Sequence, residues 1–344
     1  MQPEKHKRID HGGSLMRAVR EFPDAPTPWI DLSTGISPHS YGYSPIPATA
    51  FSRLPEPSAL LDLCAAAARC YGARAGDNLA AAPGTHLLVP MIAQHAFGGR
   101  AASSVKAAIL SPTYAEHAQA CRMAGFKTVE TDDFDALSQA DLALVVNPNN
   151  PDGRFTPDSD LLALSHKLAA KGGMLILDEA FRDVLDEPSA LVADVHVGLS
   201  VLRSFGKFYG LAGIRLGFAV TEPDLAQGLR QRLGPWAIPG PALHIGLEAL
   251  TDVEWQAAMR RQLADEAGRL DAMLNEAGLI VAGGTPLFRY VRDPSAQALY
   301  QHLGHAGILV RRFAERPDCL RIGLPKGEEW ARLQAALCTA NWQR

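Results

Sequence analysis

One lysine, Lys207, stands among glycines and apolar residues in the segment RSFGKFYGLAGIRLGF, which runs from Arg203 to Phe218. Neighbours of this kind remove solvation from an amine and lower its pKa, and an unprotonated amine can attack a carbonyl carbon. Ser204 lies three residues before the lysine and Arg215 eight residues after it. A lone lysine in a loop is more often a solvated surface residue, so a catalytic Lys207 requires other functional residues at the same site.

Two polar segments supply candidates for such residues. The segment VVNPNNPDG, from Val145 to Gly153, follows an apolar run and is rich in Asn, Pro and Gly, which predicts a tight loop. The segment LILDEAF places Asp178 directly after a second apolar run, where a carboxylate without a partner would be costly to desolvate. Open α/β sheets bind ligands at the carboxyl ends of their strands. Plainer interpretations are a helix N-cap for Asp178 and a turn residue for Asn150.

The elements that must position these residues alternate between strand-length apolar runs and helical patterns, which is typical of a mainly parallel sheet covered by helices. Strands are expected at 106–110, 142–146, 173–178 and 199–205. Helices are expected at 58–72, 84–97 and 158–172, and one long helix at 242–274 after a break at 232–242. Strand-like segments at 286–291 and 320–324 suit a smaller α+β domain. We expect an α/β fold with an N-terminal arm at 1–40, a large domain at 41–235 and a small domain at 236–344.

Composition narrows the possible partners. The 33 basic and 37 acidic residues nearly balance, and no basic stripe suited to nucleic acid is present. The five cysteines are scattered and contain no CxxC pair, so neither a disulfide framework nor a zinc site is indicated. No apolar run reaches the length of a membrane span, about 18 residues, and no signal peptide is evident. We expect a cytoplasmic protein without nucleic acid, membrane or metal as a partner.

The ordered set of an NPxG loop, DEA(F/Y) and SxxK with a following arginine resembles the fold-type I family of pyridoxal-phosphate enzymes, the aspartate-aminotransferase-like group. Within it, the sequence resembles histidinol-phosphate aminotransferases and, more closely, threonine-phosphate decarboxylases of cobalamin biosynthesis. Three features favour the decarboxylases: HGGS at 11–14, WIDLSTGISP at 29–38, and Phe181 where relatives have a tyrosine. The resemblance implies a large, mainly parallel domain and a smaller C-terminal α+β domain.

The resemblance also implies roles for residues around a pyridoxal 5′-phosphate cofactor. Lys207 would bond covalently to the cofactor aldehyde, and Asp178 would keep the pyridine nitrogen protonated. Asn150 would donate to the phenolic oxygen, Tyr114 would stack on the ring, and Phe181 would lie beside that oxygen. Lys207, Asp178 and Tyr114 are the candidate catalytic residues, although Tyr114 could also be an ordinary core residue.

The cofactor phosphate has its own candidate ligands. Ser204 and Arg215 would bind it through the hydroxyl and the guanidinium. Backbone NH groups of Gly84 and Thr85, at the expected start of a helix, would add further donors. Gly206 stands before the lysine where relatives often have a hydroxyl residue, so one donor is missing.

The implied substrate-binding residues are His11, Gly12, Gly35, Asn150, Arg311 and Arg321. Arg311 and Arg321 lie where the family places arginines that bind a carboxylate or phosphate, and two arginines suit a substrate with two anionic groups. Arg312 is interpreted as a surface charge that faces away from Arg311. Lys5 and Arg17 could join His11 in a phosphate site if the N-terminal arm folds over the cleft.

The resemblance implies a homodimer that decarboxylates L-threonine O-3-phosphate to (R)-1-aminopropan-2-ol O-phosphate. Relatives often carry a tyrosine that reaches the partner subunit's cofactor phosphate, and Leu54 replaces it here. The first alternative is an aminotransferase acting on histidinol phosphate. A second alternative is a non-catalytic cofactor-binding module of a regulator, which would need an N-terminal helix-turn-helix domain that we do not expect in this chain.

Overall fold

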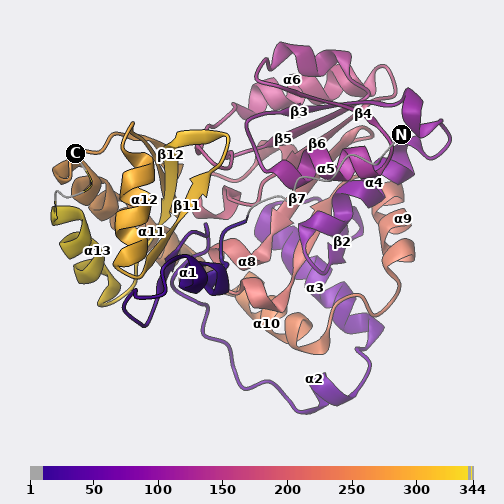
Figure 1. Cartoon of the computed structure of the whole chain (residues 1–344). Coiled ribbons are helices and arrows are strands. Elements are labelled where there is room, and N and C mark those ends of the chain that lie inside the picture. Colours follow the sequence, from indigo (N-terminus) through magenta and orange to yellow (C-terminus); the bar gives the residue numbers. More distant parts are fainter. Residues whose placement is uncertain (1–10, 340–341, 343–344) are drawn as a thin grey trace. The chain divides into compact units, whose positions relative to one another are not determined.

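The computed structural model describes residues 11–339 and 342, and these residues form two compact units (Figure 1). The larger unit comprises Ile36–Arg269 and Gly283–Leu287. The smaller unit comprises the described residues up to Gly35, the segment Leu270–Ala282 and the described residues from Phe288 onward. Each unit is built on a sheet of its own, and each is described separately.

The larger unit contains a seven-stranded sheet in the order β2-β8-β7-β6-β5-β3-β4. Its strands are β2 (Leu79–Ala82), β3 (Lys106–Leu110), β4 (Lys127–Thr131), β5 (Leu142–Val146), β6 (Met174–Asp178), β7 (Leu199–Ser204) and β8 (Gly217–Val220). Strands β3 to β7 run parallel, and β8 is antiparallel to β2 and β7. The expected α/β fold with a mainly parallel sheet is confirmed, and β3 and β5 have the predicted bounds.

Helices cover both faces of this sheet, which is why β5 and β6 are buried at every position. Figure 1 shows α6 on one side of the parallel strands and α4 and α5 on the other. The α-helices are α2 (Thr49–Ser52), α3 (Pro57–Tyr71), α4 (Leu88–Phe97), α5 (Ala115–Met123), α6 (Asp158–Ala169), α7 (Ala190–Ala193), α8 (Phe205–Phe208), α9 (Pro223–Leu233), α10 (Gly240–Thr251) and the first part of α11 (Val253–Glu276). Short 3-10 turns lie at 76–78, 85–87, 102–104, 135–139, 182–184 and 212–214.

The single long helix expected at 242–274 is wrong, because the chain forms two helices that meet at Asp252. The backbone of Asp252 is not helical, and its Oδ1 accepts a hydrogen bond of 3.0 Å from the backbone NH of Trp255. An aspartate that binds the NH three residues later is a typical N-cap. Asp252 therefore ends α10 and begins α11.

Residues 236–269, which we expected in the C-terminal domain, lie with the larger unit. The physical reason is close packing of α10 on α3. A Cβ atom on Gly246 would come within 2.9 Å of a methyl group of Leu63 and 2.7 Å of a methyl group of Leu216, so α10 lies close against α3 at this glycine.

The smaller unit contains a five-stranded sheet in the order β1-β11-β12-β10-β9. Its strands are β1 (Ile30–Leu32), β10 (Phe288–Arg292), β11 (Ile308–Phe313), β12 (Arg316–Gly323) and the first part of β9 (Val281–Thr285), and its helices are α1 (Leu15–Glu21), α12 (Ala296–His305) and α13 (Glu329–Cys338). Strand β1 pairs in parallel with β11, which fixes residues 30–32 to this unit. Strand β12 is antiparallel to β10 and β11.

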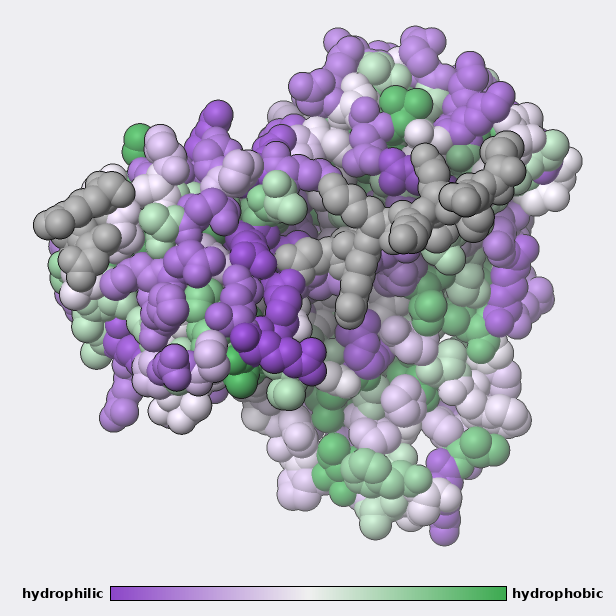
Figure 2. Space-filling model, in the orientation of Figure 1, coloured by the Kyte–Doolittle hydropathy of each residue, from purple (hydrophilic) through white to green (hydrophobic). Residues whose placement is uncertain are grey.

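The larger unit exposes several large apolar side chains near α2. Figure 2 shows apolar residues gathered over this helix. The most exposed side chains in this part of the chain are Phe51 and Leu54, at 70% and 66% exposure. Among the described residues, no helix is both long enough and apolar enough to cross a membrane.

Candidate active site

Asp178 lies at the carboxyl end of β6 and is 6% exposed. Its Oδ2 lies 2.8 Å from Nε2 of His117, which is also buried on α5, and its Oδ1 accepts a hydrogen bond of 3.0 Å from the NH of Ala180. The donor that a buried carboxylate requires is therefore a histidine together with a backbone amide. We did not predict His117, although its position one helical turn after Tyr114 in SPTYAEH was a usable signal.

Tyr114 belongs to the same group of side chains. It occupies the N-cap position of α5, and its ring packs edge-on against the His117 ring, with centroids 5.3 Å apart. The structure therefore links Tyr114 to Asp178 through His117.

Lys207 lies on α8, the single helical turn that follows β7. Its Nζ lies 5.8 Å from the centroid of the Phe181 ring, and the flanking Phe205 and Phe208 are buried. Its backbone carbonyl accepts a hydrogen bond of 2.9 Å from the NH of Ser37. The half-buried lysine thus has the apolar neighbours that the sequence indicated, and Phe181 lies beside it.

Strand register brings the candidate phosphate ligands together. Gly217 on β8 pairs with Ser204 on one side and with Ala82 on the other, two residues before Gly84. A Cβ atom on Gly217 would lie 2.8 Å from the backbone nitrogen of Thr85. Ser204 and the turn at Gly84 and Thr85 are therefore neighbours across a single strand.

Arg215 lies at the same turn. A Cβ atom on Gly84 would lie only 2.5 Å from Nη2 of Arg215, and the φ angle of Gly84 is +93°. Arg215 itself has a φ of 54° and donates from Nη1 to the carbonyl of Ala212. The guanidinium therefore occupies the space that a side chain at position 84 would fill, and Gly84 has to be glycine.

The missing hydroxyl at Gly206 also has a steric cause. A Cβ atom on Gly206 would come within 2.6 Å of Cα of Ala212, so α8 packs directly on the turn at 212–214. Any side chain at this position would push that turn, and Arg215 after it, out of place.

Asn150 lies half-buried in the loop after β5, where its neighbours have structural roles. The side chain of Asn147 exchanges hydrogen bonds with the backbone of Thr156. The side chain of Asn149 donates to the carbonyl of Pro112 and to Asp152, and accepts a bond of 2.7 Å from Thr113. Asn147 and Asn149 therefore both stabilise the turn that carries Asn150.

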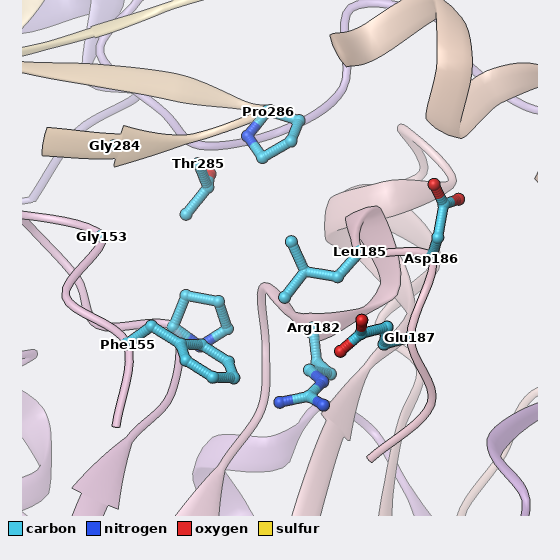
Figure 3. Close-up of a pocket in the computed structure, with 10 residues that line it drawn as sticks. Gly153, Phe155, Arg182, Leu185, Asp186, Glu187, Gly284, Thr285 and Pro286 are labelled. Carbon is cyan, nitrogen blue, oxygen red and sulfur yellow. The ribbon is translucent and has the colours of Figure 1, made fainter. Parts of the chain in front are cut away.

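A pocket of about 470 Å³ borders this loop at Pro148, Gly153 and Phe155. Figure 3 shows Phe155, Leu185 and Pro286 on its walls, with Arg182 below Leu185. None of its lining residues is a candidate cofactor ligand. The pocket is therefore distinct from the group around Asp178 and Lys207.

In the smaller unit, Arg311 and Arg321 are direct cross-strand partners on β11 and β12. Arg321 is 6% exposed, donates to the carbonyl of Ser33 at 2.9 Å and stacks over the Phe288 ring. Burial, followed by the neighbouring charge of Arg311, lowers the pKa of Arg321 to about 9, so this guanidinium is still charged at neutral pH. Like charges placed directly opposite each other are unfavourable, and the negative charge of Asp31 partly offsets this effect by raising the pKa of Arg321.

The N-terminal glycines lie beside this arginine pair. A Cβ atom on Gly12 would lie 2.4 Å from the carbonyl oxygen of Ser33, the same atom that accepts from Arg321. Ser33 Oγ accepts from the NH of Gly13 and donates to Asp31. Of the other candidates, Gly35 is buried two residues after Ser33, and His11 is exposed. Lys5 lies outside the described residues.

The interpretation of Arg312 as a plain surface charge is wrong. Its two terminal nitrogens bind the carboxylate of Glu21, the shorter contact being 2.9 Å, and its guanidinium stacks 4.5 Å from the centroid of the Tyr300 ring. Arg312 therefore ties β11 to α1.

Another group of polar side chains, His166, Asp194 and His196, has ligand atoms within 4.8 Å of one another. The two imidazole rings stack nearly parallel, with planes 12° apart, so their in-plane lone pairs do not converge on one point. Arg74 also pairs with Asp194. In this arrangement the group is not a formed metal site.

The chain is similar to known proteins over most of its length. Residues 49–337 match the family model of class I and II aminotransferases. A threonine-phosphate decarboxylase from Pseudomonas aeruginosa is 42% identical over 333 residues, which is 96% of this chain and 97% of the relative. A histidinol-phosphate aminotransferase from Oleidesulfovibrio alaskensis is 32% identical over 213 residues. This alignment covers only 57% of this chain and 55% of the aminotransferase.

A solved structure of similar fold is histidinol-phosphate aminotransferase from Sinorhizobium meliloti in complex with pyridoxal-5′-phosphate. It has a TM-score of 0.78 at 20% identity, over 98% of this chain and 96% of the other. The chain belongs to the family of class I and II aminotransferases. The resemblance to this family and to threonine-phosphate decarboxylases, drawn from the sequence motifs, is confirmed.

Proposed function

We propose that this protein is a pyridoxal-phosphate-dependent carboxy-lyase that converts L-threonine O-3-phosphate to (R)-1-aminopropan-2-ol O-phosphate and CO2, a step of cobalamin biosynthesis. The choice of substrate rests on Arg311 and Arg321, which are paired residues on the neighbouring strands β11 and β12. Threonine phosphate carries a carboxylate and a phosphate, whereas histidinol phosphate carries only the phosphate. The more extensive similarity to threonine-phosphate decarboxylases supports the same choice.

The residues of the larger unit fit pyridoxal 5′-phosphate. Asp178 is a buried carboxylate whose two oxygens accept from His117 and from a backbone NH, so its charge can stabilise a protonated ring nitrogen. The turn at Gly84 and Thr85 has Arg215 against it, a combination of backbone NH groups and guanidinium that suits a phosphate. When bound, the cofactor supplies an electron sink for the electron pair that CO2 leaves on the α-carbon.

Side chains of the protein would bind the substrate and transfer the proton. Arg311 and Arg321 would hold the substrate anions, so that the bond to the carboxylate is the one held in the reactive orientation. Lys207 would hold the cofactor until substrate binds. Its Nζ would then deliver the proton that replaces the carboxylate on the α-carbon.

A substrate panel tests this proposal. We expect kcat/KM for L-threonine O-3-phosphate to exceed that for L-threonine, which lacks the phosphate, by at least about tenfold, because a charged hydrogen-bonded contact is lost. Histidinol phosphate with 2-oxoglutarate should give little glutamate. Equal activity on threonine and threonine phosphate, or rapid glutamate formation, would reject the proposal.

We further propose that the protein is a cytoplasmic homodimer. The exposed apolar side chains near α2, which include Phe51 and Leu54, suit burial against a second copy of the chain.

The cytoplasmic location is supported by the cysteines, because all five are free thiols, which fits a reducing compartment. The dimer is tested by its mass. Light scattering coupled to size-exclusion chromatography should give twice the chain mass of 36.9 kDa, and a shift to monomer is expected for Phe51→Glu.

A further inference from the structure

A buried group of charges lies behind the candidate cofactor site. Arg203 on β7 donates from Nη1 to Oε2 of Glu179 at 2.7 Å and from Nη2 to Oδ1 of Asp183. All three residues are at most 6% exposed, and the guanidinium lies 4.5 Å from the centroid of the Tyr71 ring. Glu179 also accepts a hydrogen bond of 2.6 Å from the hydroxyl of Ser189.

The position of this group in the sheet links it to the cofactor residues. Glu179 directly follows Asp178, and Arg203 directly precedes Ser204. The two strand ends are neighbours, since Asp178 pairs with Leu202 and the NH of Glu179 donates to the carbonyl of Leu202 at 2.9 Å. Successive side chains of a strand point to opposite faces. Asp178 thus meets His117 on one face, while Glu179 meets Arg203 on the other.

Stability alone does not explain this group. Burial raises the pKa of Glu179, opposed mainly by the charge of Arg203, and the neighbouring Asp183 and Glu179 raise the pKa of Arg203 despite its burial. Asp183 Oδ2, Arg203 Nε and the Tyr71 hydroxyl have no hydrogen-bond partner within residues 11–339 and 342. Buried ion pairs can often be replaced by apolar residues without loss of stability. A charged pair, unlike an apolar one, fixes the distance and direction between two strand ends.

We propose that Glu179 and Arg203 are positioning residues that hold Asp178 and the segment from Ser204 to Lys207 in register for the cofactor. The inference rests on the proposed cofactor site. Neither residue belongs to the set that would contact the cofactor, and both act through the neighbours to which they are bonded. Their loss should therefore change cofactor affinity beyond any effect on folding.

The chain offers a matched control in the pair Arg182 and Asp158. This pair is bidentate, at 3.0 and 3.1 Å, and Arg182 is 3% exposed. Its guanidinium stacks against Phe155 at the pocket of Figure 3, and the pair's other side-chain hydrogen bonds go to the backbone of Pro188 and Ala190. Arg182 follows Phe181 in the chain, and its backbone NH donates to the carbonyl of Glu179, so only the side-chain pair serves as the control. Breaking it removes an ion pair that does not join the ends of β6 and β7.

The experiment compares Glu179→Gln and Arg203→Lys with Asp158→Asn and Arg182→Lys. Urea unfolding of the cofactor-free proteins measures stability, and titration with pyridoxal 5′-phosphate, followed by absorbance, measures the cofactor Kd. We expect all four variants to lose stability, and only the first two to raise the cofactor Kd, by roughly tenfold or more, as outer-shell substitutions do at other ligand sites. Arg203→Lys keeps the positive charge, so its cofactor Kd should lie between those of the wild type and of Glu179→Gln.

Wild-type cofactor affinity in a folded Glu179→Gln or Arg203→Lys variant would overturn the positioning role. Equal losses of affinity in both pairs would also overturn it, since the effect would then be general destabilisation. If Glu179→Gln does not fold, Arg203→Lys decides the question by the same comparison. Failure of the wild-type protein to bind the cofactor would refute the proposed function and, with it, this inference.

Discussion

At the scale of single residues, the environment of Asp178 decides what the site can do. Its partners are the imidazole of His117 and a backbone NH, not a guanidinium or an ammonium. A carboxylate with a permanent cation beside it would have its charge already neutralised. With His117 as partner, Asp178 keeps the capacity to stabilise a cationic ring nitrogen. The sequence predicted the need for a donor, but His117 is 61 positions away, and its spacing from Tyr114 was the signal that we did not use.

Loss of His117 should weaken the cofactor site. His117→Ala leaves one oxygen of a buried carboxylate without its donor, which is unfavourable for the charged form of Asp178. We expect the cofactor Kd to rise by roughly tenfold, measured by absorbance titration. His117→Gln, which retains an NH donor, should recover part of this loss. Unchanged affinity in His117→Ala would show that the contact has no role in cofactor binding.

Lys207 should carry the cofactor covalently. Borohydride reduction of the loaded protein, followed by peptide mass spectrometry, should place a pyridoxyl group on the peptide that contains Lys207. Lys207→Ala should still bind cofactor noncovalently but lose turnover by several orders of magnitude, because attachment and proton transfer are lost together. Modification of Lys106 or Lys171 instead would contradict the assignment.

At the scale of elements, strand register brings the candidate phosphate ligands together. Ser204 on β7, Gly217 on β8 and Ala82 on β2 form one row, which sets the turn at Gly84 beside Ser204. The apolar runs of β3 and β5 predicted their strands to the residue, because buried parallel strands are continuously apolar. The break between α10 and α11 was missed, because both helices have apolar faces and the only signal was the capping residue Asp252.

Restoring a hydroxyl residue at position 206 should be harmful. Gly206→Ser places a Cβ atom within 2.6 Å of Ala212 Cα, and overpacking of this kind typically costs about 1–3 kcal/mol. Urea unfolding should show this loss, and cofactor affinity should fall because the turn that leads to Arg215 moves. A variant of wild-type stability with tighter cofactor binding would contradict the steric explanation for Gly206.

At the scale of the whole chain, the sequence predicted the mainly parallel α/β fold and the motif residues, but not how the N-terminal segment is held. Gly12 and Gly13 contact Ser33, whose carbonyl also accepts from Arg321. These contacts join residues nearly 300 positions apart, and no periodicity in the sequence encodes them. The sequence did not predict that the larger unit extends to Arg269. This boundary depends on how closely α10 approaches α3, which is also a long-range contact.

The five free thiols should differ in reactivity across the chain. Burial raises the pKa of Cys64 and Cys121 to about 11, so both remain neutral at physiological pH, whereas Cys338 is exposed. A thiol-specific disulfide reagent at neutral pH should therefore label Cys338 first. Because the folded-state pKa values lie above the unfolded value near 9, the contribution of Cys64 and Cys121 to stability is present below pH 9 and declines as pH rises toward 11. Prompt labelling of Cys64 in the folded protein at neutral pH would contradict the structure.

The most direct test of the central claim measures CO2 and (R)-1-aminopropan-2-ol O-phosphate together, after incubation of the cofactor-loaded protein with L-threonine O-3-phosphate and no added keto acid. We predict equal amounts of the two products, matching the substrate consumed, because in the proposed site the two arginines would orient the carboxylate for departure. Arg321→Gln should slow the reaction, since a buried charged contact to the substrate is lost. Consumption of the substrate without CO2 release, or turnover only with histidinol phosphate and 2-oxoglutarate, would contradict the account and identify the protein as an aminotransferase.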